Sequence, residues 1–166
     1  MGEHGAMVRW QRGDGGDFRR GRYSRVHEWR FDGGSVVRAS AAPSNVPAPW
    51  SAADAIDPEE AFVAALASCH MLWFLSLAAA RGLVVERYED DAVGTLDRRP
   101  DGVEAITRVE LRPCATFAGA APDRRALDAL HDEAHARCFI AHSVRSEVVI
   151  SPRERADAGA TARPAG

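Results

Sequence analysis

The sequence contains few cysteines and little net charge, and no long apolar run stands at its start. Three of its 166 residues are cysteines, an odd number that argues against a structural disulfide framework. Since residues 1–22 are rich in Gly and Arg, we expect no signal peptide, and the cytoplasm is the predicted location. The net charge of −3 gives no reason to expect nucleic acid or an anionic membrane as a partner.

One stretch, from Asp57 to Gly82, is predicted to be a long central helix. Asp57 can act as the N-cap, Pro58 fits the first helical position, and Glu60 stands where its side chain can close a capping box. Gly82 is the residue type that commonly ends a helix. Both ends of the helix are therefore marked in the sequence.

This helix is apolar on nearly every side, so it must be surrounded by protein or by lipid. Between residues 61 and 80, polar side-chain atoms occur only at Ser68, Cys69, His70 and Ser76. The length would suffice to span a bilayer. However, the many alanines gain little from lipid, and a central histidine is costly there. We therefore expect the central helix of a soluble core, with no membrane partner.

The remaining chain alternates between strand and helix patterns. Period-two alternation predicts strands over residues 23–31, 35–40, 83–96, 103–117 and 144–150, and a second helix follows Pro122. Asp-Gly-Gly at 32–34 and Pro-Asp-Gly at 100–102 predict turns, and the Pro-rich segment 41–51 predicts a loop. The order ββ-α-ββ-α-β predicts an α+β domain over residues 23–150, with two helices packed on antiparallel sheet. Residues 1–22 are predicted to be a flexible arm and residues 151–166 a disordered tail.

Two cysteines lie on the apolar faces of the two predicted helices. Cys69 is central in the first helix, and Cys138 ends an apolar stripe in the second. Both can be inert core residues. Alternatively, they are a peroxidatic and a resolving thiol, in which a sulfenic acid on one condenses with the other. Cys114 falls among charged residues of a predicted strand, so we expect a partly exposed, incidental thiol.

A peroxidatic thiol needs a cation or hydrogen-bond donor close by. His70 follows Cys69 but points about 100° away around the helix. Glu59 lies ten residues before Cys69, about 15 Å along the axis, so the two cannot touch within one chain. Glu59 therefore either serves the pocket of a second subunit or stabilises the start of its own helix.

A zinc site is a competing interpretation of the histidines. His131, His135 and Cys138 share one side of the second helix, and Cys69 or His70 could add a fourth ligand. The segment 131–135 resembles the zinc-protease helix but has Asp where that motif requires Glu, so a metalloprotease is poorly supported. Solvated histidines on a polar face are the commoner explanation.

Two segments of the chain carry a family resemblance. Asp57-Pro58-Glu59-Glu60, followed by Ala-Leu-Ala-Ser-Cys ending at Cys69, resembles the Asn-Pro-Glu-Glu/Gln…Ala-Cys motif of the OsmC/Ohr family. That family is named after osmotically inducible protein C and the organic hydroperoxide resistance proteins. Residues 134–143, a helix that ends at Cys138 ahead of the last strand, are similar to its second signature. The element order is similar too, over residues 23–150.

The resemblance implies an OsmC-like fold, an intertwined homodimer whose long central helices pack together with antiparallel sheets around them. It implies thiol-dependent reduction of organic hydroperoxides, with Cys69 as the peroxidatic cysteine, Cys138 as the resolving cysteine and Glu59 as the acidic partner. A dithiol, lipoylated proteins among them, would reduce the disulfide, and no bound cofactor is required. The alternative is a non-peroxidatic, ligand- or zinc-binding protein on the same fold.

The sequence departs from this family at one position of the site. The family's active-site Arg lies in the loop before the central helix or in the first hairpin, and neither segment contains Arg here. Arg25, Arg30, Arg38 or His70 remain candidates for that role. Trp73 and Phe74 are candidates to line an apolar pocket, or else they fill a dimer core.

Overall fold

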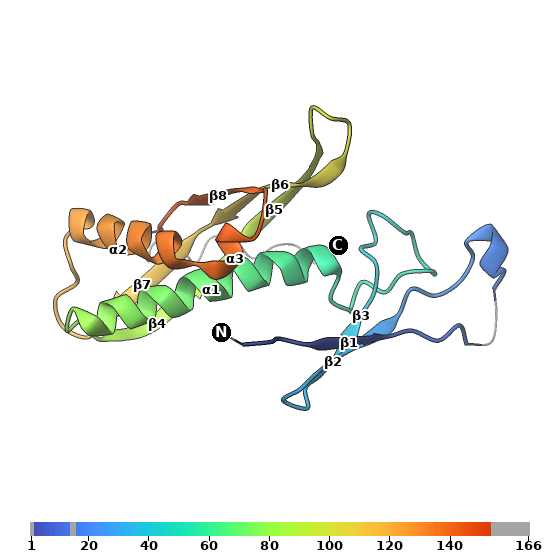
Figure 1. Ribbon diagram of the computed structural model, residues 1–166, viewed down its shortest axis with the longest axis horizontal. Coiled ribbons are helices and arrows are strands. Elements are labelled where there is room, and N and C mark those ends of the chain that lie inside the picture. Colours follow the sequence, from blue (N-terminus) through green and yellow to red (C-terminus); the bar gives the residue numbers. More distant parts are fainter. Residues whose placement is uncertain (1, 14–15, 154–166) are drawn as a thin grey trace. The chain divides into compact units, whose positions relative to one another are not determined.

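The computed structural model describes residues 2–13 and 16–153, so most of the predicted tail, residues 151–166, lies outside the described residues. The chain divides into two compact units, residues 1–61 and 62–166 (Figure 1). The predicted α+β class is confirmed.

The first unit is built on a three-stranded antiparallel sheet. Its strands, in the order β1-β2-β3, are β1 (Ala6–Arg9), β2 (His27–Phe31) and β3 (Val36–Ala39). The predicted tight turn joins β2 to β3, with Gly34 at φ +84° as the glycine that the turn requires. Strand β1 and the single 3-10 turn Phe18–Arg20 fall within the predicted arm, and neither was predicted.

The predicted helix is α1 (Pro58–Ala80), and its capping pattern is confirmed. The Glu60 backbone N–H donates to Asp57 Oδ1 at 2.7 Å, and the Asp57 N–H donates to Glu60 Oε2 at 3.1 Å. At the other end Gly82 has φ +73°, and the Leu83 N–H donates to the Ala78 carbonyl. This pattern is a Schellman cap, which requires a left-handed residue where Gly82 stands.

Each long strand predicted for the second unit is broken in two. The segments are β4 (Val85–Asp90), β5 (Val93–Arg98), β6 (Glu104–Leu111) and β7 (Pro113–Phe117). Strand β4 pairs with β7, and β5 pairs with β6. Pro113 has no N–H to donate to a neighbouring strand, and the Arg112 N–H donates to Asp90 Oδ1 instead. The last strand, β8 (Glu147–Ile150), pairs with β6 in parallel, which the expectation of antiparallel sheet did not include.

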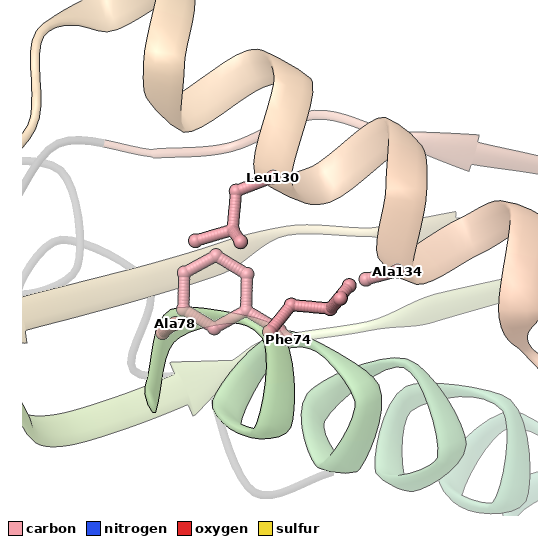
Figure 2. Packing of buried hydrophobic residues seen from close by; sticks show 5 residues of the cluster. Phe74, Ala78, Leu130 and Ala134 are labelled. Atoms are coloured by element: carbon pink, nitrogen blue, oxygen red, sulfur yellow. The ribbon is translucent and has the colours of Figure 1, made fainter. Parts of the chain in front are cut away.

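Two apolar clusters surround α1. Towards its C-terminal end, Phe74, Leu77 and Ala78 pack against Leu130 and Ala134 of α2 (Arg124–Arg137), as Figure 2 shows. Nearer its N-terminal end, Leu66 packs against Val109 and Leu111 of β6. Figure 1 shows α2 running beside α1, with the short helix α3 (Phe139–His142) after it.

Among the described residues, α1 is the one helix long and apolar enough to span a membrane. Length and composition alone give that result, and the core helix of a soluble protein meets the same criteria. Leu66, His70 and Phe74 of α1 are buried by protein.

Candidate active site

Two cysteines from different elements meet between α1 and α2. Cys69 lies in the middle of α1 and is half-buried, whereas Cys138 lies between α2 and α3 and is 1% exposed. At Cys138 the backbone leaves the helical conformation, and its Sγ accepts a hydrogen bond from the Ala141 N–H at 3.4 Å. All three cysteines of the chain are free thiols.

The environment of Cys138 keeps that thiol protonated. Burial and, to a smaller extent, hydrogen bonding with the Cys69 sulfur raise the pKa of Cys138 to about 11. The two thiols are therefore close enough to influence each other, although 69 positions separate them in the sequence. At neutral pH Cys138 is therefore a protonated thiol.

Aromatic side chains and one guanidinium adjoin the two cysteines. Trp73 follows Cys69 by one helical turn, and its indole meets the Phe139 ring edge-on at a centroid distance of 5.6 Å. The Arg137 guanidinium lies 5.6 Å from the centre of the same indole. Phe74, the other predicted pocket residue, lies instead in the fully buried core. Sequence analysis did not identify Arg137 or Phe139, although they are the two neighbours of Cys138 in the chain.

Behind the thiols lies a buried pair of imidazoles. The His70 Nε2 and His131 Nδ1 atoms are 3.0 Å apart, and the planes of the two rings differ by 6°. The ring of Phe74 stacks on His131 at a centroid distance of 4.5 Å. His131 is 3% exposed, so the expectation of solvated histidines was wrong for this residue.

Both imidazoles are uncharged at neutral pH. Burial and, to a smaller extent, the neighbouring imidazoles of His131 and His135 lower the pKa of His70 to about 3. Burial likewise lowers the pKa of His131 to about 4. His70 therefore cannot supply the positive charge that the sequence analysis considered for it.

The arrangement does not assemble the predicted zinc ligands. Within residues 2–13 and 16–153, no group of three or more His, Cys, Asp and Glu side chains is placed to hold a metal ion. One ring nitrogen of His70 and one of His131 are hydrogen-bonded to each other, and Cys138 interacts with Cys69.

The three predicted arginines of the first unit are engaged within that unit. Arg25 lies over the Tyr23 ring at 3.7 Å and donates to the Gly21 carbonyl. Arg30 pairs with Glu28 at 2.8 Å, and Arg38 pairs with Asp54 at 2.7 Å, in separate contacts.

Glu59 lies in the first turn of α1, where one of its oxygens is held. Asn45 Nδ2 donates to Glu59 Oε1 at 3.1 Å. The other oxygen, Oε2, is buried and has no hydrogen-bond partner among the described residues. Burying a carboxylate oxygen without a hydrogen-bond donor costs free energy of folding. Glu59 Oε2 is therefore an acceptor that lacks a donor among the described residues.

Two further buried groups were not expected. Cys114 is buried, so the prediction of partial exposure was wrong; the segment after β8 hydrogen-bonds along Leu111 and Pro113 and gives this edge a neighbour. Asp90, at the strand break, is partly buried, and burial raises the pKa of its carboxyl to about 6. Neither group carries a pattern that sequence periodicity can detect.

Comparisons with known proteins agree with the geometry. Residues 51–153 match the family described as OsmC-like protein. A solved OsmC-like protein of unknown function from Vibrio cholerae is 50% identical, with a TM-score of 0.89 over 92% of this chain and 100% of the other. A comparison with curated proteins gave no match.

Two more distant structures share the fold. An organic hydroperoxide resistance protein from Bacillus subtilis is 19% identical, with a TM-score of 0.64 over 92% of this chain and 98% of the other. One from Elizabethkingia anophelis is 15% identical, with a TM-score of 0.67 over 93% and 96%. At these identities the likeness concerns the fold alone.

Proposed function

Because this chain belongs to the OsmC-like protein family, we propose that it is a thiol-dependent peroxidase that reduces organic hydroperoxides. The observation that carries the proposal is the approach of Cys69 in α1 and Cys138 at the end of α2. Their surroundings differ. Cys69 is half-buried, so a peroxide can reach it, whereas Cys138 is buried and protonated beside it.

The proposed cycle uses both sulfurs. The Cys69 thiolate attacks the distal oxygen of the hydroperoxide, an S–O bond forms, and the O–O bond breaks. The alkoxide takes up a proton and leaves as an alcohol. The Cys138 sulfur then attacks the sulfenic acid, its proton leaves with the hydroxyl as water, and a Cys69–Cys138 disulfide forms. A dithiol, for example on a lipoylated protein, reduces this disulfide by thiol exchange.

We propose a homodimer as the working form. One side of α1 exposes Ala65, Ser68, Leu72 and Ser76 at helical spacing, and Leu72 is 61% exposed. A second copy of the same helix would cover this apolar side. An antiparallel arrangement would bring Glu59 of the partner subunit towards Cys69. The cycle requires no bound cofactor and no nucleic acid, and its thiols suit the cytoplasm.

The test is the mass of the reduced protein after brief exposure to one equivalent of cumene hydroperoxide. We expect the loss of two hydrogen atoms, which peptide digestion locates to a bridge between Cys69 and Cys138. The Cys69→Ser variant should show no such loss, and the Cys138→Ser variant should stop at a sulfenic acid on Cys69. Unchanged mass, or slow oxidation confined to Cys114, would contradict the proposal. Sedimentation of the untreated protein tests the dimer separately.

A further inference from the structure

The thiol pair is flanked by a surface that combines two aromatic rings with one guanidinium. Trp73 lies one turn beyond Cys69, while Arg137 and Phe139 flank Cys138. The Trp73 ring contacts both of these side chains. Phe139 follows Cys138 in the chain and is 69% exposed, so part of this apolar surface is open to solvent.

The charge on this surface is not neutralised. Glu133 Oε1 accepts from Arg137 at 2.6 Å, and Glu133 Oε2 accepts from Arg81, also at 2.6 Å. One carboxylate thus serves two guanidinium groups, so the cluster carries a net positive charge. The Arg137 side chain is 50% exposed and keeps donors that can bind another anion.

We propose that Arg137 makes the site selective for organic hydroperoxides that carry an anionic group on an apolar body. The peroxide group reaches Cys69, the apolar body lies on Trp73 and Phe139, and the anion pairs with Arg137. Guanidinium suits this role because it binds a carboxylate through two N–H groups while it lies against an indole. This inference rests on the proposed peroxidase function and names its substrate class.

The test compares two probes of the same shape, cumene hydroperoxide with a para carboxylate and the methyl ester of that compound. The quantity measured is the ratio of kcat/KM for the acid to kcat/KM for the ester, with dithiothreitol as the reductant. We expect Arg137→Met, which keeps an unbranched apolar side chain without the charge, to lower this ratio about fivefold, chiefly through KM of the acid. Arg137→Lys should restore much of the ratio.

Two further variants fix the interpretation. Arg125→Met removes an exposed arginine from the same helix and should leave the ratio at its wild-type value. Glu133→Gln removes the competing carboxylate and should raise the ratio. Since the contact is half exposed, about 1 M salt should bring the wild-type ratio close to that of Arg137→Met.

An unchanged ratio in both Arg137→Met and Glu133→Gln, with rapid oxidation of Cys69 by both probes, would overturn this inference and leave the peroxidase proposal standing. If neither probe oxidises Cys69 in the wild-type protein, the peroxidase proposal fails and the inference fails with it. A fall in the ratio that Arg125→Met reproduces would also overturn the role of Arg137, because it would show an effect of net charge alone.

Discussion

Two neighbouring residues of α1, Cys69 and His70, each pair with a side chain of α2 or of the residue that follows it, and the two pairs differ in exposure. Cys69 and Cys138 form the thiol pair, and His70 and His131 form the imidazole pair. Both pairs are uncharged where they are buried: burial raises the pKa of Cys138 and lowers the pKa of both histidines. The difference is that Cys69 keeps access to solvent, whereas both imidazoles are buried. One residue along a helix therefore separates the partly accessible thiol of the proposed chemistry from a buried imidazole.

The largest expected effect is the loss of hydroperoxide reduction when the thiol pair is removed. We expect Cys69→Ser to lower the rate of hydroperoxide reduction by roughly a thousandfold or more, because the attacking sulfur is lost. The same change should alter the free energy of unfolding by less than about 1 kcal/mol, since oxygen replaces sulfur at a half-buried position. Peroxide consumption with a dithiol and urea unfolding measure the two quantities. Full activity in Cys69→Ser would remove the thiol pair from the mechanism.

The imidazole pair should show the opposite balance. His131→Ala leaves a cavity and an unpaired, buried His70, so we expect the free energy of unfolding to fall by about 2–4 kcal/mol. The exposed His4→Ala should change it by less than about 0.5 kcal/mol. The double variant His70→Phe/His131→Leu should lose less than the sum of its single variants, because both partners become apolar together. Additive losses would show that the imidazole bond contributes nothing of its own.

Acid should destabilise the protein through the imidazole pair. Below pH 6.5 the unfolded chain protonates both histidines, whereas the folded protein keeps them neutral down to about pH 4 for His131 and about pH 3 for His70. The unfolded state then binds more protons than the folded state. The free energy of unfolding therefore decreases by about 1.4 kcal/mol for each imidazole with every unit by which the pH is lowered.

Asp90 opposes this loss with one proton. Its folded pKa of about 6 lies above the ordinary 3.8, so between these values the folded state binds the extra proton and stability rises as pH falls. Two imidazoles against one carboxyl leave a net loss on acidification. Urea unfolding at pH 7, 6 and 5 measures it. We expect the double variant His70→Phe/His131→Leu to abolish or reverse the slope; an unchanged slope would exclude the imidazoles as its source.

The smallest expected effect concerns the hydrogen bond that Cys138 accepts at the start of α3. Cys138 Sγ accepts from the Ala141 N–H at 3.4 Å and caps the four-residue helix α3. We expect that a disulfide to Cys69 turns the Cys138 sulfur away from the Ala141 N–H and so breaks this hydrogen bond. The Ala141 amide hydrogen should then exchange roughly fivefold faster. Hydrogen exchange of the reduced and the peroxide-treated protein measures it. Equal protection in both states would mean that the cap survives oxidation.

Features that depend on neighbours in the chain were predictable. The caps of α1, the turn after β2 and the apolar stripe that ends at Cys138 are patterns of a few residues, and the structure confirms each. The breaks in the two long strands were only partly predictable. Pro113 signalled an irregularity, but the hydrogen bond from the Arg112 N–H to Asp90 joins residues 22 positions apart.

The sequence alone determined the α+β class, the long apolar helix and the two cysteines that matter for the proposed chemistry. Only the tertiary structure decided which groups meet. The packing of α2 on α1 brings Cys138 to Cys69, His131 to His70 across 61 positions, and Arg137 to Trp73. Periodicity specifies which face of a helix is buried, but not which residue of another helix lies opposite it. That choice follows from how the side chains of both helices pack together, and it sets the charge and exposure of the site.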